Sequence, residues 1–486
     1  MSLIKKAVSG IKWTFVGTIG LSIFQILQIS ILTRYLSKEV FGLVAMALFT
    51  LNLTSIFANM GMTTAILHRQ DATKNEYSSI YWLNIFISLF LYVILFIMAP
   101  VAAKFYNEPD LHAVIIILGV NLLLMAAGRQ HRTIMQKQFQ FKSIAITELF
   151  SYVCGLIAAI TLAVHGFGVY SLVYSSLLSS CLSNGLFLVQ NLKLNPIGFH
   201  FRFSETKAFL KIGGYTTGSS LLDFFSREID ILIVGKTLGV ESLGVYSLVK
   251  QIVMKVLTVI NPIIMNVFSP LLSSIQNRKE QMKDVYLKVV QNLAYMNFLI
   301  YTLMIVNVRE ILQVLYGSQY VEASLVFVFL AFTYCLSALS NPTGSLQVAT
   351  GRTDLGFKWT ILRIIVSPLA IYLGSLISIE AVAMYYSFLS LLLIIPLWYV
   401  QIKPMIYVSL WGYISKFYKP FIFFITISGL VILTQDIIPI ASNQIVSALI
   451  KSVIITVLYL AYLLAVDRCA VINSYNLLES ILKPKK

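Results

Sequence analysis

The stretch of sequence that decides the fold is residues 221–246, LLDFFSREIDILIVGKTLGVESLGVY. The first part is an apolar run that carries several charges. Two glycines, Gly235 and Gly239, separate it from a second apolar run. In a helix, Asp223, Arg227 and Asp230 have the i, i+4, i+7 spacing of one face, and Glu228 lies about 100° from Arg227. Charges inside a spanning helix are costly and are functional candidates by default. The question is therefore whether the flanking runs can cross a membrane.

The composition and the apolar runs both indicate a membrane protein. Of the 486 residues, 58% are hydrophobic and only 12% are charged, against about 25% charged in soluble domains. This composition excludes a soluble multidomain protein and a disordered chain. A spanning helix needs about 20 mostly apolar residues. We predict fourteen spans, at 12–33, 40–60, 78–103, 111–127, 143–164, 168–190, 210–235, 243–267, 289–307, 321–340, 359–378, 381–400, 418–435 and 444–466.

The positions of the basic residues predict the topology. The formal charge is +16, and most Lys and Arg residues fall in alternate connecting segments that include both termini. By the positive-inside rule, both termini are cytoplasmic. The basic charge thus reports topology, and no nucleic-acid partner is expected. The cysteines lie far apart without metal-ligand spacing, so we expect no metal site, no disulfide framework and no cofactor.

A short motif recurs in the two halves of the chain. Residues 36–42, LSKEVFG, and 238–244, LGVESLG, share L-x-x-E-x-x-G at an offset of 202 residues. Six spans return the chain to its starting side, so the halves form a parallel repeat about an axis along the membrane normal. We therefore predict an all-α integral membrane protein with two six-helix lobes and two extra C-terminal helices. The predicted parts are an N-lobe at 1–207, a C-lobe at 208–403, helices 13 and 14 at 404–466 and a cytoplasmic tail at 467–486.

The predicted eighth span adds two cations, Lys250 and Lys255. Lys255 falls near mid-depth, too far from water to snorkel easily. With Arg227, whose planar fork suits phosphate oxygens, these lysines are candidate contacts for an anionic group. The acids Asp223, Glu228 and Asp230 are candidate ion-coupling sites. Two simpler interpretations stay open: an Asp–Arg–Asp ladder that locks helices together, and lysines that only neutralise these acids.

Several weaker candidates lie in other spans. The 202-residue offset maps Arg227 and Asp230 onto Gln25 and Gln28, so the first lobe is polar but neutral at the matching places. Arg363 is a further cavity candidate. It and Glu148 either snorkel or form ion pairs. Lys451 is expected to snorkel.

The connecting segments carry little chemistry. The inner loop 128–142 is basic without an acid, which suits anionic lipid headgroups or a simple topology signal. Residues 269–288 read as a cytoplasmic linker helix. The longest outer loop is 308–320.

The pattern from Asp230 to Tyr246, D-x-x-I-x-G-x-x-L-G-x-x-x-L-G-x-Y, resembles the helix 7–8 signature of bacterial polysaccharide flippases. Further segments resemble the Wzx-type branch of these repeat-unit flippases, within the multidrug, oligosaccharidyl-lipid and polysaccharide exporter superfamily. These are YWLN at 81–84, MQK at 135–137 with Phe139 and Phe141, NPII at 261–264, NPTGS at 341–345 and FK at 357–358. The likeness runs from Lys5 to about Pro404.

The resemblance implies a transporter in the bacterial inner membrane and no enzyme. Its cargo would be an undecaprenyl-diphosphate-linked oligosaccharide, moved from the cytoplasmic to the outer leaflet for exopolysaccharide, capsule or O-antigen synthesis. A gradient of H⁺ or Na⁺ would drive it, and a contact with polysaccharide polymerase machinery is a further expectation. The resemblance assigns no role to Arg227 or Glu228.

Three rival functions remain. A multidrug or cation antiporter of the same superfamily would favour acidic cavities, whereas acids and bases are balanced here. An envelope polymerase or ligase would need a sizeable outer loop for its catalytic groups. A purely structural membrane protein would not need charges in its spans.

Overall fold

The computed structural model describes residues 3–69, 71–192, 197–434 and 443–468, and in these ranges it contains helices and no strand. The predicted all-α class is thus confirmed. Among the described residues, twelve helical segments are long and apolar enough to cross a membrane. Helix α8 (Phe203–Thr237) carries the charged stretch, and α20 (Tyr418–Thr434) is shorter; neither is among the twelve. The total of fourteen spans stays a prediction.

The chain divides into two compact units, unit 1 (Met1–Leu248) and unit 2 (Val249–Lys486). Unit 1 includes α8 because that helix packs against α2, α3 and α4. The predicted lobe boundary at 207 remains a prediction. The helices of unit 1 are α1 (Leu3–Leu32), α2 (Lys38–Asn59), α3 (Met62–His68), α4 (Lys74–Tyr106), α5 (Asp110–Lys137), α6 (Phe141–Val164), α7 (Val169–Leu192), α8 and the start of α9 (Gly239–Lys255).

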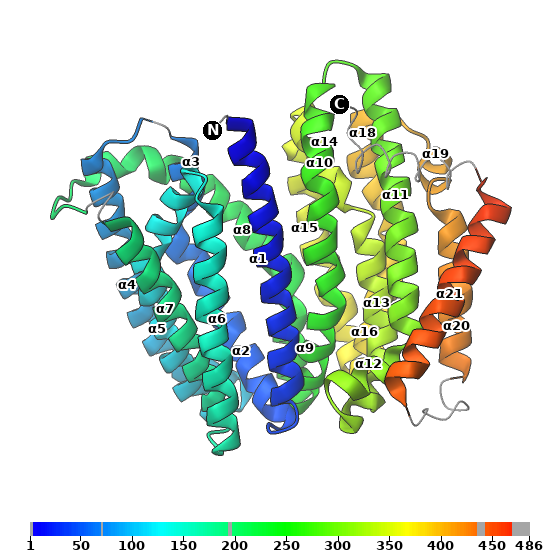
Figure 1. The fold of residues 1–486 in the computed structure, drawn as a ribbon, viewed down its shortest axis with the longest axis horizontal. Helices are drawn as coiled ribbons and strands as arrows, with labels where there is room; N and C mark the ends of the chain where they lie inside the picture. Colours follow the sequence, from blue (N-terminus) through cyan, green and yellow to red (C-terminus); the bar gives the residue numbers. More distant parts are fainter. Residues whose placement is uncertain (1–2, 70, 193–196, 435–442, 469–486) are drawn as a thin grey trace. The chain divides into compact units, whose positions relative to one another are not determined.

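Long helices packed side by side build unit 1. Helix α5 contacts α4 and α7, and α6 contacts α7 and α1 (Figure 1). Small residues permit close approach, as between helices in membranes generally. A side chain at Gly128 on α5 would overlap Asn184 of α7, for example.

The two copies of the L-x-x-E-x-x-G motif meet each other inside unit 1. A methyl group at Gly42 would overlap the carbonyl oxygen of Val240, and one at Gly244 would overlap the carbonyl oxygen of Lys38. Each position of this reciprocal contact lies 202 residues from its counterpart, which is the offset between the two copies of the motif. We call this contact the glycine crossing of α2 and α9.

Residues 198–205, which lead into the first turn of α8, are tied to α4. Trp82, part of the YWLN segment, donates from Nε1 to the Gly198 carbonyl at 3.0 Å. The Ser79 hydroxyl donates to Glu205 Oε2 at 2.6 Å, and the His200 ring lies 2.9 Å from Glu205 Oε1. This segment, which we call the α4 clamp, fixes where α8 begins.

Unit 2 contains the end of α9 and the helices that follow it. They are a π-helix (Val256–Ile260), α10 (Asn261–Ser274), α11 (Lys279–Val306), α12 (Val308–Leu315), a 3₁₀ turn (Ser318–Ala323), α13 (Ser324–Ala338), α14 (Asn341–Thr350), α15 (Thr353–Ser375), α16 (Ile379–Leu392), α17 (Ile394–Leu397), a π-helix (Trp398–Ile402), α18 (Lys403–Ile406), α19 (Leu410–Ile414), α20 and α21 (Gln444–Val466). Helix α13 contacts α11 and α16, and α10 contacts α14.

The predicted span 243–267 is three consecutive elements, because Pro262 interrupts the helical ladder. Proline lacks an N–H and its ring collides with the carbonyl four residues earlier. The chain accommodates this with the wide turn at Val256–Ile260, between Lys255 and Asn261. Such π segments are frequent at functional sites.

Three expectations for connecting segments were wrong. Residues 269–288 form no separate linker helix, since α10 ends at Ser274 and α11 begins at Lys279. The segment 308–320 is no open loop but holds α12 and the start of the 3₁₀ turn. Helix α5 runs through most of 128–142, because polar residues of its last turns, such as Gln130 and His131, are buried in protein.

The expectation that Lys451 snorkels was also wrong. Its ammonium lies 2.5 Å from Oε1 of Glu310, which pairs α21 with α12. A buried carboxylate offers a cation a better partner than distant water. The predicted tail 467–486 lies almost entirely outside the described residues.

Candidate functional site

The charged face of α8 divides into a buried and an exposed part. Asp230 is only 2% exposed. Its Oδ2 accepts a hydrogen bond from the Tyr246 hydroxyl at 2.9 Å, and its Oδ1 accepts one from the Ile231 N–H at 2.9 Å. Asp223 and Arg227 are exposed, and Glu228 is half-buried. Asp230 therefore joins α8 to α9, while Asp223 and Arg227 are accessible on the same helix.

The two candidate lysines belong to unit 2 and differ in burial. Lys250 is 3% exposed, and Lys255 is half-buried. Lys255 is the last residue of α9, directly before the π-helix. The amide of Asn261, directly after that π-helix, is fully buried and lacks a hydrogen-bond partner among the described residues. Polar groups thus flank the widened turn on both sides.

The neutral candidates of the first lobe lie on α1. Gln25 and Gln28 are half-buried, and the Tyr152 hydroxyl of α6 donates to Gln28 Oε1. Sequence reasoning missed Tyr152. The available signal was its spacing of four from Glu148, which puts two polar residues on one face of an otherwise apolar helix.

The remaining candidates have separate surroundings. Glu148 accepts from Arg132 Nε at 2.7 Å, so of its two predicted alternatives it forms the ion pair. Arg363 is half-buried on α15. Lys137, from the basic segment proposed for lipid headgroups, donates to the Arg69 carbonyl at 2.6 Å. Part of that basic charge is therefore engaged inside the protein.

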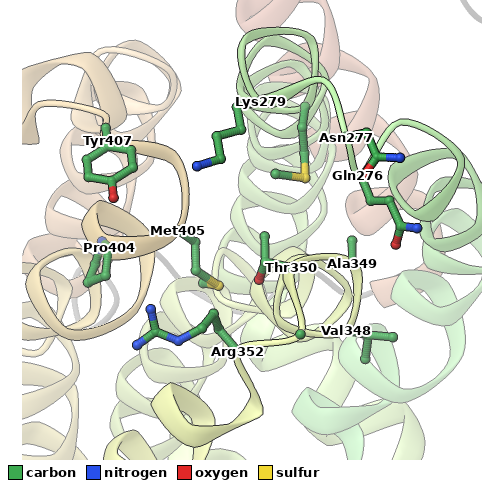
Figure 2. A pocket seen from close by; sticks show the side chains of 12 residues that line it. Gln276, Asn277, Lys279, Val348, Ala349, Thr350, Arg352, Pro404, Met405 and Tyr407 are labelled. Carbon is green, nitrogen blue, oxygen red and sulfur yellow. The ribbon is translucent and has the colours of Figure 1, made fainter.

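Unit 2 also contains a cavity of about 530 Å³ that was not predicted (Figure 2). The turn between α10 and α11, the turn between α14 and α15, and the end of α18 surround it. We call it the basic cup. Its lining includes two cations, Lys279 and Arg352, and no carboxylate among the described residues that line it. The buried side chains of Met282 and Met405 contribute an apolar part of its wall.

Comparison with known proteins places this architecture. TuaB of Bacillus subtilis (strain 168), a teichuronic acid biosynthesis protein, is 29% identical over 428 residues, covering 87% of each chain. The lipopolysaccharide biosynthesis protein WzxC of Escherichia coli (strain K12) is 26% identical, covering 87% of this chain and 86% of WzxC. The inward-closed structure of the lipid II flippase MurJ superposes with a TM-score of 0.73 at 14% identity, covering 94% of this chain and 99% of MurJ.

The apolar helices, the charges carried on α8 and this structural likeness define a multi-pass membrane protein with a transporter-type fold. The chain belongs to the polysaccharide biosynthesis protein family, which it matches over residues 31–325. The resemblance to Wzx-type proteins is thereby confirmed.

Proposed function

We propose that the chain moves undecaprenyl-diphosphate-linked oligosaccharide repeat units from the cytoplasmic to the outer leaflet of the bacterial inner membrane. The movement proceeds by alternating access, is driven by a gradient of H⁺ or Na⁺ and serves the synthesis of a surface polysaccharide. Both termini then lie in the cytoplasm.

The observation that carries this proposal is family membership in a chain that also holds ionisable residues on α8. The match covers residues 31–325 and so includes α8. Relatives named for teichuronic acid and lipopolysaccharide biosynthesis support a polysaccharide cargo. An amphiphilic cargo with charged phosphates needs polar side chains inside the membrane. The charged residues of α8 are such side chains.

The roles of individual residues follow from their chemistry. Arg227, Lys250 and Lys255 are proposed to contact the diphosphate, since Arg227 offers a planar fork and the lysines offer point charges. Asp223, Glu228 and Asp230 are proposed to couple ion movement, because carboxylates within spanning helices are the groups that bind cations or relay protons in transporters. Gln25, Gln28 and Arg363 are proposed weaker contacts.

The test is complementation in a bacterium that lacks its own repeat-unit flippase. The chain should restore surface polysaccharide and deplete lipid-linked repeat units from the cytoplasmic leaflet. Arg227→Lys should impair transport more than charge conservation suggests, because the fork is lost. Restored polysaccharide with an unchanged pool of inward-facing repeat units would contradict flipping.

This strain and a second strain with an intact flippase separate the rival functions. A drug or cation antiporter would raise resistance to cationic compounds and leave the lipid-linked pool unchanged. A polymerase or ligase would alter polysaccharide chain length in a strain whose flippase is intact. Contact with polymerase machinery is tested by co-purification from the strain whose flippase is intact.

A further inference from the structure

We propose that the basic cup of unit 2 is a binding site for a phosphate or diphosphate group. The cup lies at the end of unit 2 that the charge pattern predicts to be cytoplasmic. The inference rests on the proposed function in one respect: the flipped lipid presents such a diphosphate at that membrane surface. The chemistry of the cup stands independently of transport.

Three polar side chains line the cup. Figure 2 shows the Lys279 ammonium and the Tyr407 hydroxyl above the Met405 side chain and the Arg352 guanidinium below it. All three groups donate hydrogen bonds. A volume of about 530 Å³ is within the range of about 300–1,000 Å³ that small-ligand sites occupy. A phosphate group is the simplest ligand that accepts from all of them.

The backbone adds to the positive potential. Helix α11 begins at Lys279 and α15 begins at Thr353, and neither start has a side-chain cap. The positive dipole ends of two helices therefore border the cup. The end of α14 adds little opposing charge, since its Gln347 carbonyl accepts from the Arg352 N–H at 3.0 Å.

Arg352 already holds a planar anion from outside the lining. Its Nε and Nη2 donate to the two oxygens of Asp354 at 2.9 and 3.0 Å. This is the paired geometry by which arginine binds phosphate. Both side chains are nearly half exposed, so the carboxylate can exchange for a ligand. Asp354 is thus a competitor for the guanidinium.

The position of Tyr407 indicates a local constraint. Its backbone has φ 49° and ψ 37°, in the left-handed region that non-glycine residues rarely adopt. The side chain is nevertheless 75% exposed, so core burial does not account for this conformation. Such strain is found preferentially at ligand sites. Tyr407 is the residue that caps the end of α18, and it belongs to the lining of the cup.

The experiment is calorimetric titration of sodium pyrophosphate, and separately of inorganic phosphate, into the purified full chain in zwitterionic nanodiscs. Arg352→Gln and Lys279→Gln should each weaken binding about tenfold, equal to about 1.4 kcal/mol. Asp354→Asn should strengthen binding, because it releases the guanidinium. The matched control is Lys288→Gln, an exposed lysine on α11 outside the lining, which should change nothing.

A second arm identifies the source of the phosphate. The same variants are placed in nanodiscs of phosphatidylglycerol or phosphatidylcholine, and retained lipid is measured by native mass spectrometry. Loss of phosphatidylglycerol from Arg352→Gln without any response to pyrophosphate assigns the cup to the bilayer headgroup. A response to pyrophosphate assigns it to a diphosphate.

The opposite responses of Arg352→Gln and Asp354→Asn separate a binding role from a structural one, since disruption would weaken binding in both. If neither variant changes binding in either arm, the inference is overturned. A chain that fails to flip repeat units but shows these opposite responses would refute the proposed function and leave the cup. A chain that flips repeat units but shows no change in binding in either arm would support the proposed function and overturn the inference about the cup.

Discussion

Lys451 and Glu310 form an ion pair in which the ammonium nitrogen lies 2.5 Å from Oε1 of the carboxylate. Glu310 is only 4% exposed, and the same oxygen accepts from the Ser447 hydroxyl at 3.0 Å. Asn307 adds a hydrogen bond to Ser452, one residue beyond Lys451, at 3.0 Å. These polar contacts fix how the otherwise apolar α21 is rotated about its axis and where it lies along that axis.

Removing one partner of this pair should destabilise unit 2. Lys451→Met leaves a buried carboxylate uncompensated, and we expect a loss of about 3 kcal/mol. Adding Glu310→Gln should recover most of it, because the stranded charge disappears. Thermal unfolding in detergent measures both. Equal Tm values for the single and double variants would contradict the pairing.

Asp230 and Tyr246 permit a test that separates coupling from packing. Tyr246→Phe removes a donor from a buried carboxylate and should cost about 1–3 kcal/mol of stability. Transport per folded molecule should persist. Asp230→Asn should abolish transport while the inserted amount stays normal. Full complementation by Asp223→Asn, Glu228→Gln and Asp230→Asn, each tested singly, would refute the coupling role of these acids.

The predicted sidedness is tested by cysteine labelling. In a background without the native cysteines, Ser37→Cys and Ser318→Cys should react with an impermeant thiol reagent added outside intact cells. Ser274→Cys should react only after permeabilisation. All three positions are exposed in their units, so accessibility depends on the side of the membrane. The reversed pattern would overturn the positive-inside assignment.

The α4 clamp should loosen at acid pH. Glu205 precedes the predicted span 210–235, and hydrogen bonds from Ser79, then His200, lower its pKa from the ordinary 4.5. A lowered carboxyl pKa stabilises the fold at neutral pH, and that contribution is lost as the pH falls below this value. The hydrogen-exchange protection factors of the Gly198 and Arg202 amides, which donate to Ser78 and Ser79, should fall there. With Glu205→Gln, this acid-dependent fall should disappear.

The glycine crossing predicts a steric effect. Gly244→Ala places a methyl group against the Lys38 carbonyl and should cost about 1–3 kcal/mol, because α2 and α9 must separate. Gly185→Ala on α7, where nothing lies within 4 Å of the new methyl group, is the matched control. It should be neutral or stabilising. A Tm for Gly244→Ala equal to that of the control would show that the crossing is loose.

Hydropathy predicted the helices because lipid contact is encoded locally. The predicted span 143–164 differs from α6 (Phe141–Val164) only at its first residues. Errors arose where protein replaces lipid as the surroundings of a helix. The last turns of α5 are polar yet buried, so a hydropathy criterion ended the helix too early at 127. The charges of α12, Arg309 and Glu310, likewise made that helix look like a loop.

The sequence identified candidate residues in the spans, and their contacts were not predictable from it. Asp230 was identifiable because charges are rare in spans, and its partner Tyr246 stands in the same motif. The partner of Lys451 lies 141 residues away, and no local pattern indicates it. The basic cup was missed because its lining comes from three separate turns that only the folded chain assembles.

The glycine crossing also limits how this sequence can change over generations. Gly42 meets the backbone of the later motif and Gly244 meets the backbone of the earlier one, so neither glycine can be lost without displacing the other. Surface loops in the stretch between them, residues 43–243, tolerate insertions at little entropic cost. Descendants of this chain can therefore gain whole loops more readily than one methyl group at the crossing.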